Sequence, residues 1–420
     1  MSTTVNNPAA TDQAVDNPAA TDQAVDNPAA TDQAVDNPAA TDPGAQAPAV
    51  RQTVPPEEKY AAELEFLAAH DSGPRPPGWR LTPRAVVTFV MGSDGEKLKA
   101  GRRSLAVEQK FVGERALVER CVVTLAGERG LLLVGEPGTA KSMLSELLAA
   151  AVCGTSALTV QGTAGTTEDQ LKYGWNYALL LAKGPSREAL VPSPVLTAMT
   201  TGAVARVEEV TRCLPEVQDA LVSLLSERRV AVPELAGSPD GQLHAAAGFT
   251  LIATANLRDK GVSEMSAALK RRFNFETVGP IGSLAAEVEL VRRQSTAAVA
   301  RAGAPYAVDD AVLEALVTAF RDLRTGRSTE GWDVERPSTV MSTAEAVSVA
   351  TALGVSAAYL PDGGDLLGRL PGQLIGVVRK DDPADAARLL GYWDGPVRRR
   401  AEQGAGTWRT LWDLRSALEA

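Results

Sequence analysis

The sequence predicts an α/β fold, in which helices flank a parallel sheet, followed by a part built of helices alone. From about Phe111, apolar strand-like runs alternate with amphipathic helical stretches, which is typical of layered α/β folds. One such run, residues 131–134, leads through a glycine-rich turn directly into a helix. Beyond Gly282 the strand-like runs stop, and apolar residues recur at helical spacing over residues 283–300, 308–323 and 338–353.

The composition limits the class of protein. A chain of 420 residues with 45% hydrophobic residues can bury a sizeable core in two or three domains. The net charge is −10, but residues 1–50 hold seven aspartates and no lysine or arginine, which leaves −3 on the remainder. A mildly acidic body argues against wrapping of duplex DNA, although a narrow basic channel stays possible.

Cysteine and histidine are scarce. Cys121, Cys153 and Cys213 are odd in number, far apart and unsupported by a histidine pair, so we expect neither a zinc site nor a disulfide framework. His70 and His244 offer no obvious base for a Ser-His-Asp device. No apolar run has the length of a membrane span, and no charged-then-apolar signal opens the chain. We therefore expect a cytoplasmic protein without membrane insertion.

The chain opens with four copies of a ten-residue unit, which begin at Val5, Val15, Val25 and Val35. Each unit has a proline, aspartate and no large apolar group, so it cannot bury enough surface to offset the entropy of ordering. Solenoid repeats need about 20 or more residues per unit. Residues 1–54 are therefore predicted to form a disordered tail.

Residues 55–105 are predicted to form a small helical region and linker. A helix is expected from Pro55 to His70, before a Gly/Pro-rich break at residues 73–78. A second small element around residues 81–91 precedes a basic stretch that ends at Arg103.

The turn after residues 131–134 has the residue types and spacing of a phosphate-binding loop. Backbone N–H groups of such a loop wrap phosphates, and Lys141 would reach the β- and γ-phosphates. Ser142 can ligate Mg²⁺, while Ala140 stands where the pattern usually has a second glycine. The sequence therefore predicts a site for a nucleoside triphosphate such as ATP. The loop consists of Gly135, Glu136, Pro137, Gly138, Thr139, Ala140, Lys141 and Ser142.

A second strand, residues 203–209, ends in two carboxylates that would face this loop at the carboxyl edge of a parallel sheet. Nucleotide hydrolysis needs one acid near the Mg²⁺ and one to orient and deprotonate water. We assign the first role to Glu208 and the second to Glu209. The usual pair is Asp-Glu, so Glu208 carries an extra methylene.

Two further polar features follow. A third strand, residues 249–255, delivers Asn256, whose amide can hold a water near the γ-phosphate, although an asparagine here can also simply stabilise a turn. Arg271 and Arg272 precede the strand of residues 273–278. An arginine supplied by a neighbouring subunit can neutralise transition-state charge. A solvated charge run is the alternative, and the sequence does not decide which arginine faces a neighbour.

Together these features resemble the AAA+ ATPases, and more narrowly the MoxR family, over about residues 106–355. The resemblance implies a Mg·ATP-dependent ring, usually a homo-hexamer, with active sites between subunits. It implies an ATP-binding domain over residues 106–282 and a helical lid with C-terminal helices over 283–420. Val112 and Gly113 would then lie near the adenine, and Arg272 best matches the arginine finger.

The narrower assignment rests on two insertions and lacks one element. Residues 162–202 and 227–248 stand where the family carries hairpins. The family's lid usually presents an arginine to the γ-phosphate from the start of a helix, here expected over residues 338–353. Val340 stands about where that arginine is expected, and Arg336 is an alternative from one turn earlier.

The resemblance implies a chaperone-like remodeller or activator of a client protein, working with a partner that bears a von Willebrand factor A domain. One alternative is a nucleic-acid-linked motor of a restriction or defence system, for which Lys172, Lys183 and Arg187 are thin support. Another is a nucleotide-gated scaffold with little turnover.

Overall fold

The computed structural model describes residues 51–256, 262–304, 306–360, 365–380, 382–404 and 406–419. The ten-residue repeats, and with them the expected disordered tail, lie outside the described residues. The chain divides after Gln52, and the helices and strands of the described residues belong to the unit that begins at Thr53.

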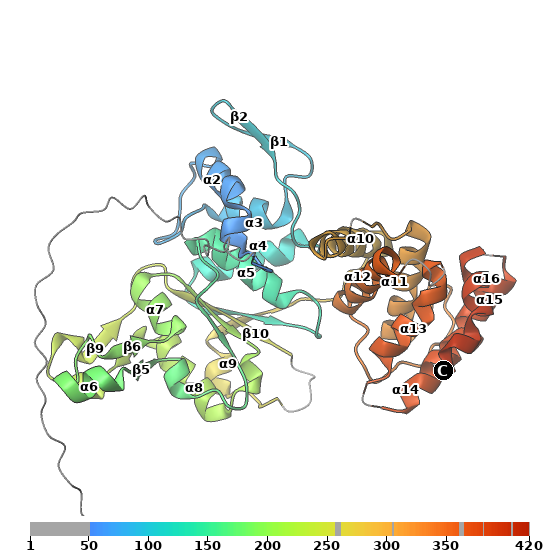
Figure 1. Cartoon of the computed structure of the whole chain (residues 1–420). Coiled ribbons are helices and arrows are strands. Elements are labelled where there is room, and N and C mark those ends of the chain that lie inside the picture. The colour runs from blue at the N-terminus through green and yellow to red at the C-terminus, as the bar shows by residue number, and fades with distance from the viewer. Residues whose placement is uncertain are drawn as a thin grey trace, which may run out of the picture. The chain divides into compact units, whose positions relative to one another are not determined.

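A five-stranded parallel sheet forms the centre of the α/β part (Figure 1). Its spatial order is β11-β3-β10-β7-β4, so β3, which comes first in the chain among these five strands, lies second from one edge. The predicted parallel α/β class is thereby confirmed. The strands are β3 (Gly130–Val134), β4 (Thr159–Gln161), β7 (Val204–Glu208), β10 (Thr250–Ala255) and β11 (Phe273–Thr277).

Helices cover both faces of the sheet, which explains why β3, β7 and β10 are buried along their whole length. Leu131 and Leu133 pack in one apolar cluster with α4 (Arg115–Ala126) and α5 (Lys141–Cys153). Leu132 and Val134 pack in a second cluster with α7 (Pro194–Thr201) and α8 (Pro215–Ser226). Alternate residues of one strand therefore anchor opposite layers.

The first described elements share the core of the α/β part. The predicted helix is broken at Tyr60 into α1 (Pro56–Lys59) and α2 (Ala61–His70), and α3 (Pro83–Met91) follows. The side chains of α2 and α3 lie in the same apolar cluster as α4 and α5. The basic stretch forms an antiparallel hairpin of β1 (Lys97–Ala100) and β2 (Arg103–Ala106).

Both expected insertions contain hairpins. The first pairs β5 (Tyr173–Trp175) with β6 (Leu190–Pro192) and carries α6 (Tyr177–Lys183) between them. The second pairs β8 (Arg229–Ala231) with β9 (Gln242–His244). A four-residue helix, α9 (Ala267–Lys270), precedes β11.

Helices alone build the part after residue 283, and the described residues there contain no strand beyond one isolated bridge between Arg327 and Asp333. Most of these helices contribute to one apolar cluster that includes Phe320, Tyr392 and Trp393. The helices are α10 (Leu284–Arg301), α11 (Asp310–Thr325), α12 (Thr343–Tyr359), α13 (Leu366–Val378), α14 (Ala384–Tyr392), α15 (Arg398–Glu402) and α16 (Gly406–Asp413). Within the described ranges no helix is both long and apolar enough to cross a membrane.

Helix α12 begins five residues later than the predicted start at Ser338. The backbone N–H and hydroxyl of Ser338 both donate to Asp385, which holds the preceding segment outside the helix. The start is instead set by a capping box, in which Ser342 and Glu345 satisfy each other's backbone N–H groups. The expectation that Val340 lies at the helix start is therefore wrong.

Candidate functional site

The phosphate-binding loop joins β3 to α5, as the sequence predicts. Gly135 is required by packing, because a Cβ there would lie 2.3 Å from the carbonyl oxygen of Val278. Gly138 and Ala140 adopt left-handed backbone conformations, with φ of +74° and +66°. Alanine rarely adopts this conformation, so Ala140, where the pattern usually has glycine, strains the backbone of the loop.

Lys141 opens α5 and is 5% exposed. Its Nζ donates to the carbonyl oxygens of Gly135 and Glu136 at 3.0 and 2.8 Å, so the ammonium lies back across the loop. Burial lowers the pKa of Lys141, while the charges of Glu209 and Glu208 oppose that shift. This ammonium is placed to meet an anion bound by the loop.

Glu208, the last residue of β7, accepts hydrogen bonds at both oxygens of its carboxylate. Its Oε2 accepts from the hydroxyls of Ser142 and Thr254 at 2.7 and 2.8 Å. Its Oε1 accepts from Ser145 at 2.6 Å and from Arg206 at 2.7 Å. Burial raises the pKa of Glu208, but these hydrogen bonds and the Arg206 charge outweigh it and leave the pKa below its usual value. The carboxylate is therefore ionised and held beside Ser142.

Glu209 differs from its neighbour. Its backbone is left-handed, with φ of +54°, and its N–H donates to the hydroxyl of Thr254 at 2.9 Å. Its Oε2 is buried without a hydrogen-bond partner among the described residues, and Arg212 Nε lies 3.6 Å from it. A buried carboxylate oxygen left without a donor is suited to orienting a water molecule.

Asn256 follows β10 directly and is 4% exposed. It lines a cavity of about 300 Å³ together with Gly135, Glu136 and the segment 277–280, which begins at the last residue of β11. The ends of three neighbouring strands therefore bring the loop, the acid pair and Asn256 to one edge, as the predicted parallel sheet requires.

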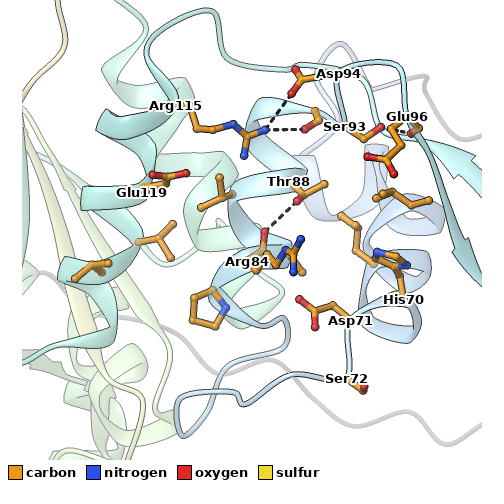
Figure 2. A pocket seen from close by; sticks show the side chains of 18 residues that line it. His70, Asp71, Ser72, Arg84, Thr88, Ser93, Asp94, Glu96, Arg115 and Glu119 are labelled. Atoms are coloured by element: carbon orange, nitrogen blue, oxygen red, sulfur yellow. Dashed lines mark hydrogen bonds and ion pairs between the residues drawn. The ribbon is translucent and has the colours of Figure 1, made fainter.

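A larger hollow of about 880 Å³ lies elsewhere, between α2, α3 and α4 (Figure 2). Some of its polar groups bind one another. Arg115 donates to Asp94 at 3.5 Å, and Thr88 donates to the carbonyl oxygen of Arg84 at 3.0 Å. Because it holds none of the residues assigned above to nucleotide chemistry, volume alone does not identify the functional site.

Four of the predicted site residues make no contact with the phosphate-binding loop that the structure shows among the described residues. Val112 is half-buried and Gly113 exposed in the segment before α4, and their nearness to adenine stays a prediction. Arg272 donates to the hydroxyl of Ser226 and to the carbonyl oxygen of Ala268 in its own chain, whereas Arg271 is exposed. The exposed guanidinium of Arg271 is thus the more accessible of the two to a neighbouring molecule.

The lid contacts the loop through a residue that the sequence reasoning missed. A Cβ on Gly138 would lie 2.4 Å from the Cβ and Oγ of Ser342 and 3.5 Å from the Cβ of Ala344. The start of α12 therefore lies against the loop, with serine and alanine where the resemblance implies an arginine. The capping-box spacing of Ser342 and Glu345 was the sequence signal that could have located this helix start.

The sequence analysis also did not single out Arg206, although a lone arginine inside the apolar run of β7 marks it.

Two family models match parts of the chain. Residues 285–419 match the YehL-like AAA+ ATPase C-terminal domain, and residues 130–273 match the AAA domain of the dynein-related subfamily. The uncharacterised protein YehL of Escherichia coli (strain K12) is 47% identical over 367 residues, which span 87% of this chain and 98% of YehL. An uncharacterised protein of Staphylococcus haemolyticus is 29% identical over 198 residues, 47% of this chain and 69% of that protein.

Solved structures are more distant. NtrX of Brucella abortus in complex with ADP aligns with a TM-score of 0.42 and 14% identity, over 74% of this chain and 68% of NtrX. A candidate ATPase of Cytophaga hutchinsonii aligns with a TM-score of 0.33 and 21% identity, over 44% of this chain and 52% of that one.

Proposed function

Because this chain belongs to the YehL-like family of AAA+ ATPases, we propose that it binds Mg·ATP at the loop between β3 and α5 and hydrolyses it there. One observation carries the proposal. Ser142 and Glu208 share a 2.7 Å hydrogen bond, while Oε2 of the next residue, Glu209, is buried 3.6 Å from Arg212 Nε and has no hydrogen-bond donor among the described residues. Adjacent acids in unlike environments suit the two separate roles that hydrolysis requires.

The residues divide the work in the following way. The loop N–H groups and Lys141 bind the phosphates, and the Ser142 hydroxyl and Glu208 carboxylate are hard oxygen ligands that fit Mg²⁺. Bound Mg²⁺ would neutralise phosphate charge. Glu209 accepts the proton of the attacking water, and Asn256 holds that water in line.

We further propose a MoxR-like ring, a homo-hexamer whose neighbours supply Arg271 or Arg272, acting in the cytoplasm as a chaperone-like remodeller. The two hairpin insertions and the exposure of Arg271 support it. A von Willebrand factor A-domain partner and a client protein belong to the same proposal. The nucleic-acid alternative is weakened, because Lys172 and Lys183 each pair with a nearby glutamate of the first insertion.

Replacing Lys141 tests the binding step. We expect Lys141→Ala to lose about 3 kcal/mol of charge-assisted contact with the phosphates. ATP affinity, measured by isothermal titration calorimetry, should then fall about 100-fold. Lys172→Ala is the matched control, because this lysine pairs with Glu168 in the first insertion. The ATP affinity of this variant should equal that of the wild type. Unchanged ATP affinity in Lys141→Ala would refute the site.

A further inference from the structure

Arg206 is a charged residue in the middle of a strand that helices cover on both faces. It is 3% exposed, and its neighbours in β7 are valine and alanine. Buried strands of parallel sheets normally read as continuous apolar runs. A buried charge is costly unless it is paired and hydrogen-bonded, so the partners of Arg206 reveal its role.

The guanidinium of Arg206 is held by three elements of the site. Its Nη2 lies 2.7 Å from Glu208 Oε1, its Nε donates to Ser145 Oγ at 3.0 Å, and its Nη1 donates to the carbonyl oxygen of Ser156 at 2.9 Å. Arg206 and Glu208 are two residues apart in one strand, so both side chains point to the same face, where Ser145 of α5 meets them. The pair is thus fixed from the strand, the helix and the loop before β4.

Arg206 and Ser142 bind different oxygens of Glu208. Oε1 accepts from Arg206 and Ser145, whereas Oε2 accepts from the hydroxyls of Ser142 and Thr254. Within the described ranges, no group of three or more acidic, histidine or cysteine side chains is placed to hold a metal ion. A divalent cation beside the Ser142 hydroxyl would therefore meet one carboxylate oxygen of Glu208, while the guanidinium of Arg206 bonds the other oxygen of the same carboxylate.

We propose that Arg206 is a positioning residue that neutralises Glu208 and so prevents the site from holding a divalent cation without nucleotide. Mg²⁺ prefers several oxygen ligands and is usually bound through substrate phosphates as well as one or two carboxylates. The triphosphate supplies the missing oxygens and the negative charge, so metal and nucleotide arrive together. This inference rests on the proposed function, because it takes Ser142 and Glu208 as the pair that faces the metal.

Mn²⁺ binding to the nucleotide-free protein, followed by the electron paramagnetic resonance of free Mn²⁺, tests this role directly. We expect Arg206→Met to bind Mn²⁺ about tenfold or more tightly than the wild type, because the opposing charge is removed a few ångströms from the cation. Arg206→Lys keeps the charge and should behave as the wild type. Adding Glu208→Gln to Arg206→Met should abolish the gain.

Circular dichroism checks separately that each Arg206 variant folds. Arg206→Gln keeps a donor for the Ser156 carbonyl, and the double variant leaves no unpaired buried charge. A purely structural role for Arg206 would lower the unfolding midpoint of the neutral variants without changing Mn²⁺ affinity, and that result would overturn the inference. Tight Mn²⁺ binding by the nucleotide-free wild type would also overturn the inference, and that measurement needs no variant.

The inference and the proposed function fail in distinguishable ways. If the wild type binds no ATP, the proposed function fails, while the Mn²⁺ series still reports on the Arg206–Glu208 pair. If the wild type binds Mg·ATP but Arg206→Met and Arg206→Gln gain no Mn²⁺ affinity, only the inference fails.

Discussion

At the scale of single residues, the phosphate-binding loop carries backbone strain at Ala140. A left-handed conformation costs a non-glycine residue about 1–2 kcal/mol. Glycine relieves that cost but loses about 0.4–1 kcal/mol through the greater freedom of the unfolded chain. We expect Ala140→Gly to raise the free energy of unfolding by about 0.5–1 kcal/mol, measured by urea denaturation.

Ala297→Gly is the matched control for this substitution. Ala297 is exposed in the middle of α10, where the backbone is helical, so the same change should lower the free energy of unfolding by about 1 kcal/mol. If both substitutions destabilise the chain alike, the left-handed conformation of residue 140 does not strain it.

The positions of single site residues were predictable from the sequence where a local pattern indicates them. Lys141, Ser142 and Glu208 follow from spacing and from the edge at which parallel strands end, and the structure brings them together. The role of Arg206 was not predictable, because Ser145 and Ser156 lie 61 and 50 residues away in the chain. Contacts of that separation exist only once β7 and α5 are packed.

At the scale of elements, Glu287 joins three helices of the lid. It is 0% exposed on α10 and accepts from Arg321 and Arg324 of α11 at 2.8 and 3.0 Å. It also accepts from the hydroxyl of Thr343, the first residue of α12, at 2.6 Å. Arg321 donates in addition to the carbonyl oxygen of Gly282, just before α10. This carboxylate therefore ties the start of α12, which lies against the loop, to the entry of the lid.

Removing Glu287 should destabilise the protein strongly. Loss of one partner of a buried ion pair leaves uncompensated charge and costs about 3–5 kcal/mol, so we expect Glu287→Ala to lower the free energy of unfolding by that amount. Glu289→Ala is the control, because this glutamate is on the same helix but its side chain is 60% exposed. Its replacement should cost less than about 1 kcal/mol. Equal effects of the two substitutions in urea denaturation would contradict the structure.

Most elements were predictable, and the errors have physical causes. Apolar spacing located α10 and α11 to within two residues at each end. It placed α12 too early, because Ser338 is captured by Asp385 from a distant part of the chain. The helix predicted from Pro55 to His70 breaks at Tyr60, whose backbone departs from helical geometry.

At the scale of the whole molecule, strand order makes the site. β3 lies between β11 and β10, and β10 lies beside β7, so residues 135, 208 and 256 lie at the carboxyl ends of neighbouring strands. Alternation in the sequence predicted a parallel sheet but not this order. The order places the predicted loop, acid pair and asparagine at one edge, and the lid adds Ser342.

The central claim, ATP hydrolysis with Glu209 as the acceptor of the water proton, is tested most directly by phosphate release from ATP in the presence of Mg²⁺. General-base catalysis contributes about 100-fold or more, so Glu209→Gln should lose at least that factor in rate while ATP affinity, measured on the same sample, stays unchanged. Glu216→Gln, which changes an exposed glutamate at the start of α8, should release phosphate as the wild type does. A Glu209→Gln protein that hydrolyses ATP at the wild-type rate would contradict the account.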